Sequence, residues 1–154
     1  MRKLPILLSL LLVSLLAACS SGPPKRIFPP QASVQELRVQ DDGQWVASIR
    51  LQNFSTVPMR FSRLQATLDI AGQEATRIDI DPAMSIGPGS IEVLQHVFTP
   101  AAGPRAAISE AFANRRAVRY QLAGRLASSE HGTDDAFDYS SALNPVPGLT
   151  GVLR

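Results

Sequence analysis

Apolar and polar residues alternate with a period of two through most of the chain beyond residue 33. Between residues 45 and 53 the odd positions carry Trp45, Ala47, Ile49, Leu51 and Asn53, whereas the even positions carry Val46, Ser48, Arg50 and Gln52. Successive side chains of an extended strand point to opposite faces, so this pattern predicts a strand with one buried face. Similar patterns at residues 34–39, 64–70, 78–80, 91–98, 118–126 and 136–143 bring the predicted strands to seven.

Turn residues separate these predicted strands. Asp41-Asp42-Gly43 predicts a tight turn between the first two strands, and Ala71-Gly72 predicts another further along. Residues 82–89 are rich in proline and glycine, which cannot continue a strand, so we expect a loop there. Residues 128–133 are expected to turn the chain into the last strand.

One stretch, residues 103–116, breaks the period of two. Pro104 suits a first helical position, Ile108 and Phe112 stand four residues apart, and Arg115 and Arg116 lie where cations favour a helix C-terminus. We therefore expect a short helix that covers a sheet edge or the mouth of a barrel. Seven short strands without alternating helices favour a mainly β fold, an antiparallel sandwich of the immunoglobulin or fibronectin type III kind.

The N-terminus has the layout of a secretory signal. Arg2 and Lys3 precede an apolar stretch at residues 4–15, and small residues stand just before Cys19. The apolar stretch is shorter than the ~20 residues that a membrane-spanning helix needs, so residues 1–18 are predicted to be a signal peptide.

The segment LLAACSSG resembles the lipobox of bacterial lipoproteins. The resemblance implies cleavage between Ala18 and Cys19, acylation of Cys19, and a membrane as partner through the lipid anchor. Ser20 after the cysteine resembles the outer-membrane sorting pattern, which implies a lipid-anchored outer-membrane protein at the periplasmic face. An ordinary signal peptide with a chance cysteine is the alternative.

Behind the cysteine, residues 19–32 carry four prolines and few apolar residues, and we expect an extended tether that lifts the domain off the bilayer. The remaining residues, 33–154, suffice for one domain with one core.

The charge and the cysteine content bear on binding to nucleic acid and on the source of stability. Removal of residues 1–18 takes Arg2 and Lys3 from the 15 basic residues and nothing from the 13 acidic ones, so the mature chain has no formal net charge. A neutral surface exerts no long-range attraction on nucleic acid, and we expect no nucleic-acid partner. With Cys19 acylated, no thiol remains for a disulfide, so stability has to come from the core.

The sequence carries no recognisable reaction chemistry. His96 and His131 are the two histidines, and neither has a second ligand at metal-site spacing. Asp79 and Asp81 share a strand face with Arg77, which we interpret as a solvated, ion-paired face rather than a cation site or a pair of catalytic carboxylates. Nucleophile-elbow, phosphate-loop and dinucleotide motifs are absent. We therefore predict no catalytic residue, no metal and no cofactor.

Several segments together resemble a known family. The order LRV, WVASIRLQNFSTVPMRFSRLQATLDIAG, PAMSIGPGSIEV, YQLAGRL and NPVPGLTGVLR is similar to the late-embryogenesis-abundant (LEA) type 2 family, also called the water stress and hypersensitive response (WHy) domain, over residues 33–153. The resemblance implies a seven-stranded sandwich with one helix, a link to desiccation tolerance and no enzymatic activity. Bacterial members are often predicted lipoproteins.

Asn53 is the one motif residue that carries over, at the place where family members have Asn-Pro-Asn. The alternation turns Asn53 inward, where a buried amide needs hydrogen-bond partners in the loop that leads to Met59. We expect it to cap this loop, and a ligand-binding role is the alternative.

Three functions remain open from the sequence. The favoured one is a non-enzymatic envelope protein that protects or binds client proteins under water stress. The alternative is a protein that binds a lipid or another apolar ligand between its sheets, with the helix around Ile108 as a lid. A small hydrolase would require a nucleophile and a base brought together by the fold.

Overall fold

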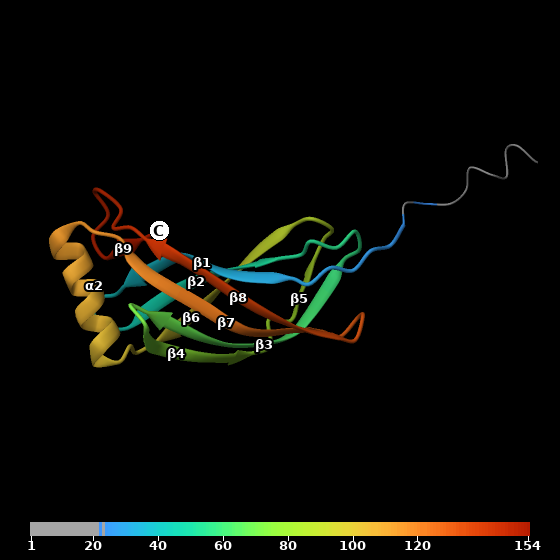
Figure 1. Cartoon of the computed structure of the whole chain (residues 1–154), viewed down its shortest axis with the longest axis horizontal. Helices are drawn as coiled ribbons and strands as arrows, with labels where there is room; N and C mark the ends of the chain where they lie inside the picture. Colours follow the sequence, from blue (N-terminus) through green and yellow to red (C-terminus); the bar gives the residue numbers. More distant parts are fainter. Residues whose placement is uncertain (1–21, 23) are drawn as a thin grey trace, which may run out of the picture.

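The computed structural model describes residue 22 and residues 24–154 (Figure 1). The predicted signal peptide, Ala18 and Cys19 lie outside the described residues. The elements are β1 (Gln31–Val39), β2 (Trp45–Gln52), β3 (Met59–Ile70), β4 (Gln73–Ile80), β5 (Met84–Ile86), β6 (Ile91–Phe98), α2 (Ala102–Asn114), β7 (Val118–Ser128), β8 (Thr133–Leu143) and β9 (Val152–Leu153). No helix in this part of the chain combines the length and apolar character needed to cross a bilayer.

The strands form two antiparallel sheets that face each other. One sheet has the order β6-β2-β1-β9, and the other has the order β4-β3-β7-β8 with β5 beside β3. The predicted mainly β sandwich with one short helix is therefore confirmed.

The expectation of a strand-free loop at residues 82–89 was wrong, because β5 pairs with the start of β3 beyond the end of β4. Two strands, β5 and β9, were not predicted. β9 pairs with Leu37 and Arg38 of β1. Both strands are too short to show a periodic pattern.

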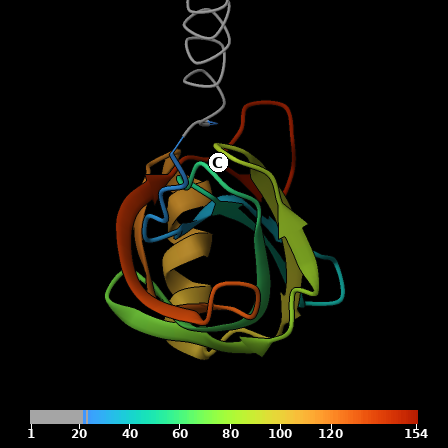
Figure 2. The same ribbon diagram turned by 90° about the vertical axis from the view of Figure 1, so that its right-hand side faces the viewer.

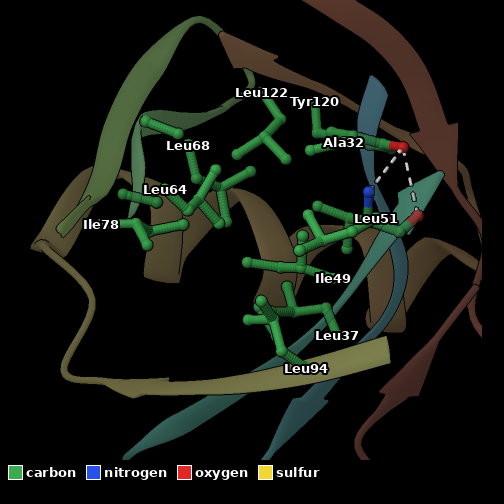
Figure 3. Packing of buried hydrophobic residues seen from close by; sticks show 14 of the residues in the cluster. Ala32, Leu37, Ile49, Leu51, Leu64, Leu68, Ile78, Leu94, Tyr120 and Leu122 are labelled. Atoms are coloured by element: carbon green, nitrogen blue, oxygen red, sulfur yellow. Dashed lines mark hydrogen bonds between the residues drawn. The ribbon is translucent and has the colours of Figure 1, made fainter. Parts of the chain in front are cut away.

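The core lies between the sheets and follows the predicted alternation. All the inward residues of β2 are buried, and so are Leu64, Ala66, Leu68 and Ile70 of β3. Figure 3 shows leucines and isoleucines from the two sheets meeting in one cluster. Burial of each such side chain contributes about 1.5 to 3 kcal/mol.

A bulge in β1 lets this strand keep a continuous inner face. The pairing with β2 shifts between Val34 and Glu36, so that Gln35 is the extra residue. Without the shift, Val34 and Leu37 would point to opposite faces, whereas both are buried.

The helix α2 closes the end of the sandwich opposite the end at which residues 24–28 lie (Figures 1 and 2). Ile108 and Ala111 are buried under it. Pro104 is the third helical residue rather than the first, which is tolerated because amides of the first turn have no acceptor within the helix. Arg115 ends the helix in a left-handed conformation.

Tyr120 of β7 links the two sheets through a pair of hydrogen bonds. Its hydroxyl accepts from the N–H of Val34 at 3.2 Å and donates to the C=O of Val34 at 3.1 Å (Figure 3). Because β9 reaches only Leu37 and Arg38, Tyr120 takes the place of a strand partner for Val34. Burial raises the pKa of Tyr120 to about 12.

We predict that Tyr120→Phe lowers the free energy of unfolding by about 1 to 3 kcal/mol, because two buried backbone groups lose their partner. The wild-type protein should lose this contribution as the pH rises from about 10 through 12, since the raised pKa stabilises only the protonated phenol. Urea unfolding at pH 8 and at pH 11.5 measures both effects. Tyr139→Phe is the control; an equal pH dependence in Tyr120→Phe and wild type would contradict the assignment.

Candidate functional site

Asn53 holds together the loops at the end of the sandwich opposite α2. Its side chain is fully buried, and its Nδ2 lies 2.8 Å from the carbonyl oxygen of Val57 and 3.0 Å from those of Ile86 and Gly87. Its Oδ1 accepts from the N–H of Ser55 at 2.8 Å. The two amide hydrogens thus serve three carbonyls, one in the loop after β2 and two at the end of β5 and just beyond it. Every polar atom of the side chain is occupied by the protein backbone, which leaves none for a ligand.

The chain that precedes β1 is bound to the same loop. The Ser55 hydroxyl accepts from the N–H of Phe28 at 3.0 Å, and the Thr56 hydroxyl accepts from the N–H of Arg26 at 2.8 Å. The N–H of Thr56 donates back to the C=O of Arg26 at 2.9 Å. Residues 24–28, part of the predicted tether, therefore lie against the domain. β1 begins at Gln31, within the predicted tether range of 19–32. Ser55 and Thr56 gave no signal in the sequence beyond their place after Asn53.

The candidate chemical groups are separated by the fold. Asp79 forms a two-point ion pair with Arg63, with N–O distances of 3.0 and 2.9 Å, and this guanidinium lowers the pKa of Asp79. Arg77, the expected partner, pairs with Glu74 instead. Asp81 accepts from a backbone N–H in the turn that follows β4. The two aspartates thus have different partners, and the predicted ion-paired face is built across β3 and β4.

The histidines also lie apart. His96, on β6, stacks on Phe98, and its Nε2 is 3.4 Å from Thr76 Oγ1. Burial lowers the pKa of His96. His131 lies in the turn between β7 and β8, where its Nε2 is 3.0 Å from the carbonyl oxygen of Pro58. Within residues 24–154, no three His, Cys, Asp or Glu side chains gather in a group that could hold a metal ion.

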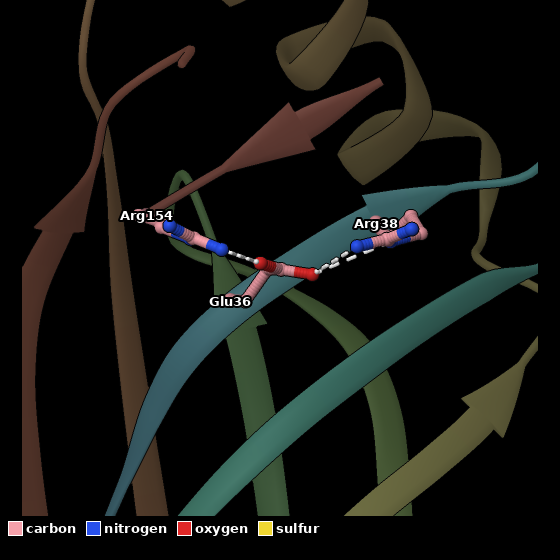
Figure 4. A network of polar contacts seen from close by, with 3 residues as sticks. All are labelled: Glu36, Arg38 and Arg154. Atoms are coloured by element: carbon pink, nitrogen blue, oxygen red, sulfur yellow. Dashed lines mark hydrogen bonds and ion pairs between the residues drawn. The ribbon is translucent and has the colours of Figure 1, made fainter. Parts of the chain in front are cut away.

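A charged cluster on the outer face of β1 has a structural role. The carboxylate of Glu36 accepts from Arg38 and from Arg154, at 2.9 and 2.8 Å (Figure 4). Hydrogen bonds from the two guanidinium groups lower the pKa of Glu36, and the contribution of Arg38 is the larger. The cluster fixes the last residue of the chain beside the bulged part of β1.

The inner faces give no support to the alternative of an apolar ligand between the sheets, because their side chains pack into one cluster. A hollow of about 460 Å³ lies outside the sandwich, between α2 and the loop that precedes β9. It is lined by Phe112, Arg115, Pro145, Val146, Pro147 and Gly148.

The free edge of β6 is the feature most suited to bind another chain. Within the described residues, β6 ends its sheet and pairs with β2 alone in that sheet. The N–H of Asn53 donates to the C=O of Ser90, which fixes the phase of the ladder, since hydrogen-bonded positions alternate along an antiparallel pair. The residues whose N–H and C=O point away from β2 are Ile91, Val93, Gln95 and Val97.

The same residues carry an apolar surface. Val93 and Val97 are 45% and 52% exposed, Ile91 is also exposed, and Val46 of β2 lies opposite Val97. Proteins commonly protect an edge strand with prolines or charged side chains, lysine above all. β6 contains no proline, lysine or arginine, and Glu92 is its one charged residue. The sequence contained a signal for this edge: Ile91, Val93 and Val97 place apolar side chains on the face opposite to the buried Leu94 and Phe98.

No protein-family model matches the chain, and no curated protein does. The chain is similar to the solution structure of AT1g01470 from Arabidopsis thaliana, with a TM-score of 0.56, 15% identity, and coverage of 86% of this chain and 93% of that chain. This similarity shows that the two proteins share a fold: they belong to one structural class of antiparallel β-sandwiches.

Two further solved structures are more distant. One is a crystal structure of a protein from Archaeoglobus fulgidus, with a TM-score of 0.42, 17% identity, and coverage of 79% and 98% of the two chains. The other is a solution structure of At2g46140.1, a candidate late embryogenesis abundant (LEA) protein, with a TM-score of 0.45, 17% identity, and coverage of 94% and 86%.

We predict that Asn53→Ala lowers the free energy of unfolding by about 1 to 3 kcal/mol, because it leaves buried carbonyls without donors. It should also speed tryptic cleavage after Lys25 and Arg26, since Ser55 loses the contact that holds its loop. Gln52→Ala, at the end of β2 just before Asn53, should stay within about 0.5 kcal/mol of wild type, because its side chain lies on the outer face. Equal melting of the two variants would contradict the capping role.

Proposed function

We propose that the protein is a non-enzymatic, lipid-anchored protein of the cell envelope whose sandwich binds extended segments of other proteins along β6 and so protects them under water stress. The observation that carries this proposal is the free, apolar edge of β6. A segment from a partly unfolded protein adds to such an edge as a further strand.

The chemistry of the edge suits clients of many sequences. The N–H and C=O groups that point away from β2 can form hydrogen bonds with any extended chain. They belong to Ile91, Val93, Gln95 and Val97. The side chains of Ile91, Val93 and Val97 favour partners with apolar residues at alternate positions. Segments of this type are exposed when proteins lose structure, and they are the segments that pair with one another in aggregates.

The other parts of the proposal rest on the sequence. The lipobox-like segment before Cys19 supports anchoring, and Ser20 supports the outer membrane. The resemblance to the LEA type 2 family supports a role in water stress without catalysis. The polar groups described above agree with this, since Asp79, Glu36 and Asn53 are each engaged by partners that stabilise the fold.

We predict that Gln95→Pro weakens binding of a dye-labelled peptide of alternating valine and threonine by more than tenfold. Proline removes an N–H that points away from β2, so the ladder within the domain stays intact. Gln95→Ala keeps the N–H and should bind like wild type. Fluorescence anisotropy measures the affinity, and circular dichroism checks the fold.

A second pair of variants tests the apolar stripe with the same peptide. Val93→Lys should weaken binding, because a lysine on an edge strand opposes further strand pairing. Leu149→Lys places the same charge at an exposed apolar position away from β6 and should leave binding unchanged. The proposed edge would be wrong if Gln95→Pro bound the peptide as tightly as Gln95→Ala. Sedimentation of the free protein shows whether a second copy occupies the edge instead.

We predict that Cys19→Ser, expressed in a Gram-negative host, moves the protein from the membrane fraction to the soluble fraction. The acyl chains that supply membrane affinity can no longer be attached. Radiolabelled palmitate should enter the wild type and a Ser21→Ala control but not Cys19→Ser. Label in Cys19→Ser would refute attachment at this residue.

A further inference from the structure

The chain before β1 leaves little length between Cys19 and the folded domain. The carbonyl oxygen of Pro24 accepts from the Thr56 hydroxyl at 3.0 Å, so the domain begins to hold the chain at this residue. Five residue steps separate Pro24 from Cys19, and a fully extended chain covers at most about 3.6 Å per residue, or roughly 18 Å in all. If Cys19 is acylated, as the proposed function holds, this end of the sandwich is confined close to the bilayer surface.

This end also exposes large apolar side chains. Ile27, Phe28 and Phe54 are each between 44% and 46% exposed. They belong to two segments that are hydrogen-bonded to each other, since Ser55, next to Phe54, binds both the N–H and the C=O of Phe28. Exposed apolar side chains grouped in this way mark an interaction surface rather than an ordinary protein surface.

The charges of the two segments fit an anionic surface. Lys25 and Arg26 are exposed, and neither residues 24–30 nor residues 53–58 contain an acidic residue. Basic residues beside apolar side chains are the composition of segments that lie in the interface of a membrane with anionic lipids.

Several backbone groups of these two segments already form hydrogen bonds within the protein. The backbone of Arg26, Phe28, Ser55 and Thr56 is engaged in the hydrogen bonds described above, and the Asn53 amide fixes the loop from within. Backbone groups paired inside the protein can enter an apolar region without losing hydrogen bonds to water.

We propose that residues 25–28 and Phe54 form a membrane-docking tip that inserts into the interface of an anionic bilayer and orients the anchored domain. The tip lies at one end of the long axis and α2 at the other, so the sandwich stands away from the bilayer (Figures 1 and 2). β6 starts near the tip, where Ile91 pairs with Gln52, and runs toward α2, so its end around Val97 lies away from the bilayer.

The test uses the full lipidated protein in vesicles of phosphatidylcholine and phosphatidylglycerol that carry bromine near the headgroup end of the acyl chains. Phe54→Trp places a fluorescent reporter in the tip, and Leu149→Trp places one in the exposed loop that precedes β9. The buried Trp45 supplies a constant background that the wild type measures. We expect bromine to quench the Phe54→Trp reporter at least threefold more than the Leu149→Trp reporter.

Flotation of the vesicles separates the failure of this inference from the failure of anchoring. A protein that does not float with the vesicles contradicts the proposed lipid anchor. A protein that floats while both reporters are quenched equally overturns the tip and leaves the anchor in place.

A second measurement starts from the protein with an unaltered tip and adds a tip variant as its control. Trypsin should cleave after Lys25 and Arg26 at least fivefold more slowly in the vesicle-bound lipidated protein than in soluble Cys19→Ser protein. The double variant Ile27→Ser with Phe54→Ser should lose this protection while it stays bound to the vesicles. Cleavage of the vesicle-bound and soluble proteins at equal rates would overturn the tip.

Discussion

The structure depends on the burial of one face of each long strand between two sheets. The chain has a single cysteine, so no internal disulfide can supply the stability. The inner residues of β2 and β3 therefore have to meet those of the facing strands with little space between them, as they do in the common cluster. The bulge in β1 follows from the same requirement, since it keeps Val34 and Leu37 on the inner face.

Polar side chains serve this packing by satisfying the backbone where the strands end or separate. Tyr120 replaces a missing strand partner of Val34, and Asn53 supplies donors to loops that would otherwise carry buried, unpaired carbonyls. Glu36 forms ion pairs with Arg38 and with Arg154. The pair with Arg154, which follows β9, helps to hold β9 beside β1. The contacts of Tyr120, Asn53 and Glu36 thus serve the fold. The proposed binding function depends instead on the free edge of β6.

The two proposed surfaces are compatible because the sandwich is elongated. The docking tip lies at the end where the chain enters the domain, while β6 runs from that end toward α2 (Figure 1). A short connection to the membrane would present that edge at a fixed height and orientation. Proteins that lose structure near the membrane would then meet a backbone edge that is ready to pair, without the need for a specific recognition sequence.

The sequence by itself determined the strands, the helix and the inward position of Asn53, because alternation and four-residue spacing are local properties of the chain. It did not predict β5 or β9, which are too short to be periodic and exist only because β3 and β1 offer them unpaired edges. Only the tertiary structure decided that Arg63 rather than Arg77 pairs with Asp79, that residues 24–28 bind the loop after Asn53, and that β6 has a free edge. Each of these depends on which distant segments become neighbours, and that is settled when the two sheets pack together.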